Sequence, residues 1–220
     1  MLSTVAIVPA PERADSPSTP SDTVLRLFDA ATAAFADNGF HATTTRDIAS
    51  RAGLSPAGVY VHFASKEELL YRLSRAGHEQ ALALITSAAD EVDSPSAALA
   101  AVMARFSAWH AEHYAIARVV QNEFPHLSEA HRDEVLALRK RIDATVRRVL
   151  RAGEASGDFV LDNVADTALA LLSIVVDVAR WYTPALHRTP EQIGATNAAL
   201  GLRLVGCRGP NPELLAALGR

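Results

Sequence analysis

Apolar side chains recur at steps of three and four residues along most of the chain, starting just after Asp22. The first series consists of Val24, Leu27, Phe28, Ala31 and Phe35. This period predicts a helix with one buried face, and Gly39 beyond it predicts where the helix ends. Similar series continue through the chain, with no alternating run that would predict a strand. We therefore expect an all-α protein of about nine helices.

Two short helices follow the first, and each has its own start residue. Thr44 is placed to cap one of them, with Asp47 as its capping-box partner, and Gly53 supplies a left-handed stop. Ser55 is placed to cap the other, and Pro56 takes the first helical position, where its missing N–H is no loss. Two short helices joined by such a turn, behind a packing helix, have the spacing of a helix-turn-helix unit.

The helices beyond this unit are longer. Ser65 and Glu68 form a capping box at the start of a fourth helix, which leaves the amino-terminal module. Residues 1–21 hold four prolines without a helical period and are expected to be a disordered tail. We expect a three-helix helix-turn-helix domain at residues 22–68, a larger helical domain at 69–206 and a tail at 207–220. Further helix starts are predicted at Ser94, Ser128, Asp162 and Thr189, and stops at Pro125, Gly157 and Pro184.

Composition narrows the range of functions. The 220 residues carry 21 basic and 25 acidic side chains, so any contact with nucleic acid must come from a local patch. Between His41 and Lys66 the balance is reversed, with three basic residues and one acidic residue. The single cysteine, Cys207, excludes an intramolecular disulfide, and no apolar run approaches the length of a membrane span. These features favour a soluble protein of the reducing cytoplasm.

The sequence has no phosphate-binding loop, no nucleophile elbow and no HExxH metal pair. His110 and His113 could share a metal ion with Glu112 or Glu123, but their spacing fixes no third ligand. We therefore predict a protein that is not an enzyme and that uses no cofactor and no metal.

Five consecutive motifs resemble the DNA-binding domain of the tetracycline-repressor (TetR) family. In chain order they are FADNGF at 35–40, TTTRDIA at 43–49, AGLSP at 52–56, VYVHF at 59–63 and SKEEL at 65–69. The resemblance implies a dimeric transcriptional regulator, usually a repressor, with a divergent carboxy-terminal domain that binds a small molecule. The second helix of such a unit enters the major groove of double-stranded DNA.

The candidate DNA contacts lie on the two short helices and just beyond them. Exposed N–H groups at Thr44 and Thr45 are expected to hold a phosphate, and Arg46 can reach the DNA backbone or a guanine edge. Tyr60 and Lys66 match family positions that touch phosphates. The full predicted set is Thr44, Thr45, Arg46, Ser55, Pro56, Ala57, Gly58, Tyr60, His62 and Lys66.

One departure from the family pattern follows Pro56. Family members often carry glycine and then threonine or serine there, whereas this chain has Ala57 and then Gly58. The missing hydroxyl shifts the expected base readout to Ala57 against a thymine methyl, to Arg46 and to DNA shape. It is also the feature that favours an alternative, a helical interaction module that does not bind DNA.

Residues 163–182 are apolar on nearly every face, and such a helix must be buried on every side. A symmetric partner subunit is the simplest cover for the face that does not pack on the chain's own core. Residues 190–204 combine small residues, which let helices approach closely, with leucines that supply area. We predict a homodimer in which these two segments of each subunit form a four-helix interface, and which reads a palindromic operator.

A ligand pocket is expected among the helices of the larger domain. Its candidate lining mixes aromatic area with polar groups, and ordinary core packing is the alternative for each residue. The predicted set is Phe106, Trp109, His110, His113, Tyr114, Asn122, Glu123, Arg180 and Trp181.

Residues 117–131, with 157–159 and 180–184, are similar to carboxy-terminal domains of TetR-type regulators of fatty-acid or sterol catabolism. Some of those regulators sense acyl-coenzyme-A thioesters, so the resemblance implies a lipophilic or acyl-coenzyme-A effector that releases the repressor from its operator. A regulator of drug efflux that senses a hydrophobic drug is the alternative. The seven basic residues within 128–151 could meet coenzyme-A phosphates, but four acidic residues among them favour a solvated helix face.

Overall fold

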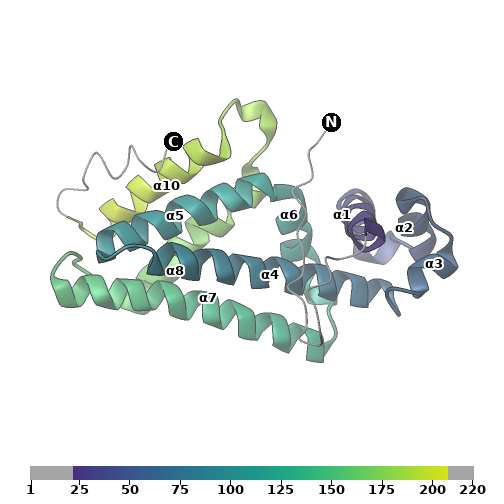
Figure 1. Ribbon diagram of the computed structural model, residues 1–220, viewed down its shortest axis with the longest axis horizontal. Coiled ribbons are helices and arrows are strands. Elements are labelled where there is room, and N and C mark those ends of the chain that lie inside the picture. Colours follow the sequence, from purple (N-terminus) through teal and green to yellow (C-terminus); the bar gives the residue numbers. More distant parts are fainter. Residues whose placement is uncertain (1–21, 208–220) are drawn as a thin grey trace. The chain divides into compact units, whose positions relative to one another are not determined.

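The computed structural model describes residues 22–207, which form α-helices joined by short turns (Figure 1). This part of the chain contains no strand, and the predicted all-α class is confirmed. The predicted tail at 1–21, and that at 207–220 apart from Cys207, lie outside the described residues. The helices are α1 (Asp22–Ala42), α2 (Thr45–Ala52), α3 (Pro56–Tyr60), α4 (Lys66–Asp90), α5 (Pro95–Glu112), α6 (Tyr114–Glu123), α7 (Glu129–Ser156), α8 (Val164–Val176), α9 (Val178–Trp181) and α10 (Pro190–Leu204), with the 3-10 turns η1 (Phe124–His126) and η2 (Pro184–Leu186).

The predicted caps of the two short helices are present. Thr44 Oγ1 accepts the Asp47 N–H at 3.2 Å, and the Asp47 carboxylate accepts the Thr44 N–H at 2.8 Å. Gly53 ends α2 in the left-handed conformation with φ of 66°, and Ser55 Oγ accepts the N–H of the third residue of α3. Local sequence is therefore sufficient to place α2 and α3.

Two helices break where the apolar period predicts continuity. His113, with φ of −105° and ψ of 24°, separates α5 from α6, although the period runs on toward Pro125. The long helix predicted at 163–182 is divided at Asp177 into α8 and the short α9. The cap of α8 is Asn163, whose side chain accepts hydrogen bonds from two N–H groups of the first turn. The predicted cap, Asp162, is therefore wrong by one residue. Apolar spacing does not reveal these breaks, because buried side chains continue on both sides of each.

The chain divides into two compact units. Unit 1 contains the described residues up to Gln80 together with Ala115–Leu138, and unit 2 contains Ala81–Tyr114 and the described residues from Arg139 onward. Both α4 and α7 begin in unit 1 and end in unit 2. The predicted boundary after residue 68 was placed at the end of the sequence motifs, whereas the two units are defined by which residues pack together. The unit that holds α1 to α3 thus also includes α6 and the start of α7.

Unit 1 is built on one hydrophobic core. Side chains of α1, α2, α3 and the first turns of α4 form most of it, and α2 and α3 lie beside each other next to α1 (Figure 1). Burial of this shared apolar area holds the later segment against the helix-turn-helix helices. The core residues that come from the later segment are Val119, Val120, Leu127 and Val135.

In unit 2, α5 packs against α8, α9 and α10. Gly194 lets the backbone of α10 approach that of α5 at Ala104, while Gly201 lies against Met103 and Leu171. The predicted role of small residues in α10, which is to permit close approach, is therefore seen within the subunit. Within residues 22–207, no helix combines the length and the apolar character needed to cross a membrane.

Replacing Gly194 by alanine tests the close contact of α5 with α10. The added Cβ would lie 2.4 Å from the Ala104 carbonyl oxygen, a backbone atom that cannot rotate away. We expect Gly194→Ala to lower the free energy of unfolding by about 1–3 kcal/mol, measured by urea denaturation. Gly58→Ala is the control, because a Cβ there meets only Ser55 Oγ and Leu54 Cβ, at 3.5 and 3.7 Å. Equal midpoints for Gly194→Ala and the wild type would contradict this interpretation.

Candidate nucleic-acid interface

The helix pair α2 and α3 leaves one edge of α3 open to solvent. Val59 is buried in the core of unit 1, whereas the next two side chains, Tyr60 and Val61, are 55% and 80% exposed. The predicted contacts Ser55, Pro56, Ala57 and His62 are exposed as well, and Gly58 is half-buried. The edge that the sequence predicts to face DNA is therefore accessible.

The hydroxyl groups predicted at this surface already have partners. Thr44 Oγ1 donates to the Asp47 carboxylate at 2.7 Å, and this bond, together with the bond from the Thr44 N–H, lowers the pKa of Asp47. Thr45 Oγ1 and the Tyr60 hydroxyl lie 3.1 Å apart and share a hydrogen bond. This bond joins the start of α2 to the end of α3, so the two hydroxyls form one polar edge.

The positive charge of this surface rests mainly on Arg46. Its side chain is exposed and makes no ion pair among the residues that the structure describes. Arg51 is paired with Asp37 at 2.8 Å, and Arg26 donates to the Ala52 carbonyl at the end of α2. These two arginines join α1 to α2. The charge of Arg51 is neutralised by Asp37, and the guanidinium of Arg26 is bonded to the backbone.

Lys66, a predicted phosphate contact, lies at the start of α4 and binds the end of α1. Its Nζ donates to the carbonyl oxygens of Phe40 at 2.6 Å, Thr43 at 2.8 Å and His41 at 3.2 Å, and lies 4.4 Å from the centre of the Phe40 ring. The ammonium group therefore caps the carboxyl end of α1. The predicted phosphate contact would require Lys66 to leave these carbonyls.

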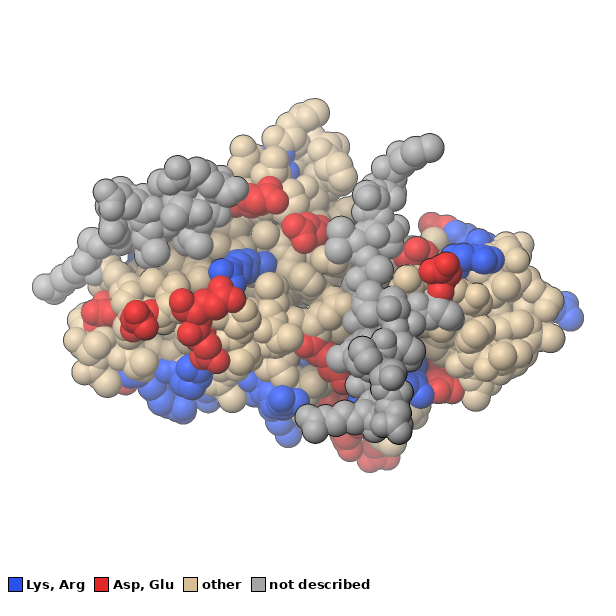
Figure 2. Space-filling view, viewed as in Figure 1, with Lys and Arg blue, Asp and Glu red and all other residues tan. Residues whose placement is uncertain are grey.

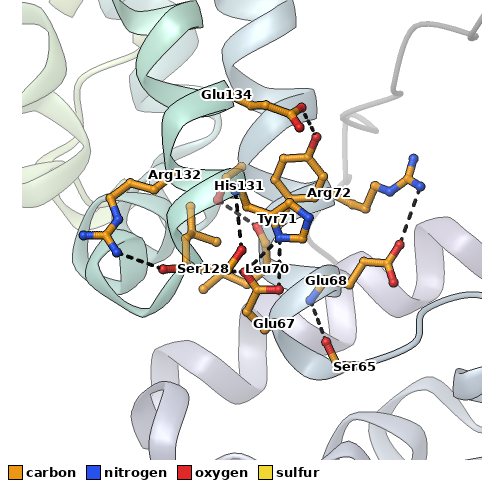
Figure 3. Close-up of polar contacts among 12 residues, drawn as sticks. Ser65, Glu67, Glu68, Leu70, Tyr71, Arg72, Ser128, His131, Arg132 and Glu134 are labelled. Atoms are coloured by element: carbon orange, nitrogen blue, oxygen red, sulfur yellow. Dashed lines mark hydrogen bonds and ion pairs between the residues drawn. The ribbon is translucent and has the colours of Figure 1, made fainter.

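The next residue, Glu67, binds the start of α7 (Figure 3). Its Oε1 accepts the Ser128 N–H at 2.8 Å and lies 2.9 Å from His131 Nδ1. The His131 ring is stacked on Tyr71, with ring centres 3.8 Å apart and planes 5° apart, and the Tyr71 hydroxyl donates to Glu134. Burial raises the pKa of Glu67, but the bonds from Ser128 and His131 outweigh it, so the pKa lies below its usual range.

The end of α1 is also contacted by α6 and η1. Glu123 Oε2 accepts the Phe40 N–H at 3.3 Å, and the His126 ring stacks on the Phe40 ring at 5.1 Å. His41 packs edge-on against His126, with ring centres 4.3 Å apart. Glu123 was predicted to bind a ligand, yet the structure places it within unit 1, at the end of α1.

Sequence reasoning misses several residues of this interface. Val61 is exposed beyond Tyr60, on the side of α3 opposite the buried Val59, and a helical projection of residues 56–61 would have found it. Glu67 and Arg26 bind backbone groups 61 and 26 residues away in the chain. No local pattern marks such partners.

The predicted ligand-binding residues belong to both compact units. Phe106 and His110 are buried in unit 2, and His110 Nδ1 bonds to the Phe106 carbonyl at 2.9 Å. His113 stacks on Trp109 with ring centres 4.8 Å apart, and Tyr114 packs against Tyr182, the residue after α9. On α9, Arg180 is exposed and paired with Asp177 at 2.5 Å, and Trp181 is 42% exposed. Asn122 and Glu123 lie on α6 in unit 1.

A cleft of about 380 Å³ lies in unit 2, among α4, α5 and the start of α10. Of the predicted ligand-binding residues, Trp109 lines it. The lining holds two carboxylates, those of Glu112 and Glu191, and one basic side chain, Arg105. Arg105 is paired with Glu91 at 2.6 Å, so the net charge at the cleft is negative. The lining residues are Leu84, Ala104, Arg105, Ala108, Trp109, Glu112 and Glu191.

The basic residues of α7 form a second charged region. Lysine and arginine side chains gather along the lower edge of the view, where α7 runs (Figure 2). Arg147 is paired with Asp143 at 2.6 Å and Arg148 with Asp90 at 2.7 Å. Among residues 22–207 no cluster of histidine, cysteine or acidic side chains could hold a metal ion, so His110 and His113 are not joined by further ligands.

Known proteins resemble both parts of the chain. Residues 27–73 match the family "Bacterial regulatory proteins, tetR family", and residues 92–205 match "Tetracyclin repressor-like, C-terminal domain". The chain is 30% identical over 191 residues to the HTH-type transcriptional repressor KstR2 of Mycolicibacterium smegmatis, a match that covers 86% of this chain and 93% of that protein.

Solved structures share the fold. A tetR-family regulatory protein from Rhodococcus RHA1 has a TM-score of 0.80 and 37% identity, covering 86% of this chain and 99% of that one. AibR, in complex with isovaleryl coenzyme A and operator DNA, has a TM-score of 0.73 and covers 81% of this chain and 97% of its own. At 19% identity, the likeness to AibR concerns the fold alone.

The lowered pKa of Glu67 leads to a prediction about stability and pH. Because the pKa is lower in the folded chain than the unfolded value of about 4.3, the charged carboxylate stabilises the fold above that pH. This contribution is lost as the pH falls through the folded-state pKa. We expect the difference in Tm between the wild type and Glu67→Gln, measured by calorimetry, to shrink below about pH 4. A difference that stays constant from pH 7 to about 3.5 would contradict the prediction.

Proposed function

This chain belongs to the tetR family of transcriptional regulators, and we propose that it binds a palindromic operator as a homodimer and is released by a lipophilic or acyl-coenzyme-A effector. The resemblance predicted from residues 35–69 is thus confirmed, as is the expectation of a regulator rather than an enzyme. The relative from Mycolicibacterium smegmatis is a repressor, which favours repression as the mode of action.

The observation that carries the proposal is the exposed edge of α3 next to the start of α2. The free charge of Arg46 and the paired hydroxyls of Thr45 and Tyr60 suit phosphate oxygens. We propose that Val61 joins Ala57 as an apolar contact in the major groove, since thymine presents a methyl group there. We propose that the other predicted contacts on this edge also meet DNA. They are Ser55, Pro56, Gly58 and His62.

Exposed apolar side chains on unit 2 support the homodimer. Leu169 of α8 is 65% exposed, and Leu200 and Leu204 of α10 are each 44% exposed. α8 and α10 are in contact with each other, so the exposed leucines come from neighbouring helices. A second copy that covers this side would bury leucines that a monomer leaves in water. It would also hold two copies of α3 at a fixed separation for a two-fold symmetric site.

Two lines support an effector of the lipid or acyl-coenzyme-A class. The carboxy-terminal match extends over most of unit 2 and beyond it, and AibR, which shares the fold, is known in complex with isovaleryl coenzyme A. Unpaired basic residues of α7, among them Lys140 and Arg151, could meet phosphate groups. A transcriptional regulator that binds DNA would act in the cytoplasm.

A second class of effector is favoured by the cleft at Trp109. Its aromatic lining and the carboxylates of Glu112 and Glu191 suit an organic cation, whereas they would repel phosphates. Burial, and after it the charges of Glu191, Tyr114 and Glu112, also raise the pKa of the nearby Tyr182 hydroxyl. A regulator of drug efflux would require such a site.

Selection of DNA by the purified protein tests the proposed function. The full chain is incubated with a pool of random-sequence duplexes, and the bound fraction is amplified and sequenced. We expect enrichment of a palindrome whose half-sites are about one helical turn apart or a multiple of it, bound by an even number of subunits. Absence of enrichment, or a monomer at micromolar concentration in sedimentation, would contradict it.

Arg46 and Tyr60 provide a paired prediction about how the enriched duplex is held. Arg46→Ala should weaken binding and reduce the slope of log affinity against log salt concentration by about one, because one cation leaves a phosphate or a base edge. Tyr60→Phe removes a neutral hydroxyl and should weaken binding to all sequences alike with the slope unchanged. Fluorescence anisotropy at several salt concentrations measures both. An unchanged affinity for both variants would place the contact surface elsewhere.

A thermal-shift panel separates the two effector classes. The wild type is heated with acyl-coenzyme-A esters, free coenzyme A, sterol acids and a cationic dye. At about 100 times its dissociation constant, a true ligand adds about 2.7 kcal/mol to the free energy of unfolding. We expect a rise in Tm with an acyl-coenzyme-A ester and a smaller rise with coenzyme A. A rise with the cationic dye alone, abolished in Glu112→Gln, would overturn the acyl-coenzyme-A assignment in favour of the cleft.

A further inference from the structure

Two consecutive residues of opposite charge at the start of α4 hold the ends of two other helices. Lys66 bonds to three carbonyl oxygens at the carboxyl end of α1, and Glu67 bonds to the N–H of Ser128, which precedes α7. The carboxyl end of a helix carries partial negative charge and the amino end partial positive charge. Each side chain therefore meets the helix end whose partial charge is opposite to its own. We call this pair the clamp.

Glu67 completes a capping arrangement that α7 lacks by itself. Ser128 Oγ accepts the His131 N–H at 3.4 Å, which is one half of a capping box. In a complete box, the side chain of the third helical residue would bind the N–H of the capping residue. Here that N–H is bound by Glu67 from α4, and the third residue, His131, binds Glu67 as well. The start of α7 is therefore closed by a residue of α4.

The contacts around the clamp fix α4 against α7 over a full turn. Tyr71 lies one turn after Glu67 on α4, and its ring stacks on His131 while its hydroxyl donates to Glu134 (Figure 3). On the other side, the carbonyl and ring of Phe40 are held by Lys66. A rotation or a slide of α7 past α4 would break the bonds of Glu67 and the ring stack together.

We propose that Lys66 and Glu67 are positioning residues for operator binding: they set the orientation of α1 to α3 relative to α7 without touching DNA. The inference rests on the proposed function. α7 continues as one helix from unit 1 into unit 2, as α4 does. A displacement of α7 would therefore reach the DNA-binding helices through the clamp, in addition to any displacement carried by α4. Phe40 lies beside this route, four residues before Thr44, the cap of α2.

Glu67→Gln, compared with Glu129→Gln, tests the inference. Both variants remove one carboxylate near the start of α7, but Glu129 is exposed and has no partner among the described residues. Loss of a negative charge favours attraction to DNA, so electrostatics alone predicts equal or tighter binding for both. We expect Glu67→Gln to bind the duplex selected by the wild type about tenfold more weakly, with the salt slope unchanged, well below its Tm. Faster hydrogen exchange of the Ser128 amide should accompany the loss.

Equal affinities of Glu67→Gln and Glu129→Gln would overturn the clamp. If Glu67→Gln does not fold, His131→Asn takes its place with the same criterion, because it removes the other partner.

Lys66→Arg should keep the affinity of the wild type, and Lys66→Met should lose affinity at constant salt slope. A decrease of the slope by about one in Lys66→Met would instead show a phosphate contact and overturn the positioning role of Lys66. Should the wild type select no duplex at all, the proposed function fails, which is a result distinct from these.

Discussion

A helix end leaves N–H or C=O groups that its own backbone cannot bond, and unit 1 must satisfy many of them within a short stretch of chain. α1, α2 and α3 are joined by turns of a few residues, so their ends lie close to one another and to solvent. Thr44 and Ser55 close two of these ends from within the motif. Arg26 and Lys66 close two more from other helices. Bonds at the helix ends therefore hold the exposed edge of α3 in place.

The distance between partners along the chain explains what the sequence could predict. Thr44 binds Asp47 three residues away, and Gly53 acts through its own backbone, so the short helices could be located from residue types alone. Lys66 and Glu67 bind groups 23 to 64 residues away, and no periodicity records such pairs. Their charges were visible, but their partners were not. Lys66 was consequently assigned to DNA on the resemblance, and its bonds to α1 came only from the structure.

The breaks at His113 and Asp177 have a related cause. Apolar spacing reports which side of a helix is buried and is silent about a change of direction between two buried segments. The break at His113 matters for the assignment of sites, because α6 belongs to the compact unit of the helix-turn-helix and α5 does not. Glu123 and Asn122 were grouped with Trp109 as polar and aromatic groups expected in one pocket of the larger domain. The structure assigns Glu123 and Asn122 to unit 1 and Trp109 to unit 2, and Glu123 binds the end of α1.

The same division gives a physical picture of regulation in this family member. The described residues of unit 2 include exposed leucines and a cleft lined by Trp109. Under the proposed function, those leucines would meet a partner subunit, and unit 1 would supply the surface for DNA. Two continuous helices, α4 and α7, connect the units, and they are tied to each other in unit 1 through Glu67 and His131. An effector that alters either helix would therefore act on the position of α3, and two-fold symmetric DNA would detect the change as a misfit between half-sites.

Hydrogen–deuterium exchange of the full chain, with and without the duplex it selects, tests the central claim most directly. The account predicts that DNA slows exchange at residues 44–47 and 56–61, where α2 begins and α3 presents its open edge. Protection confined to unit 2, or to α7 alone, would show that DNA binds another surface and would contradict the account.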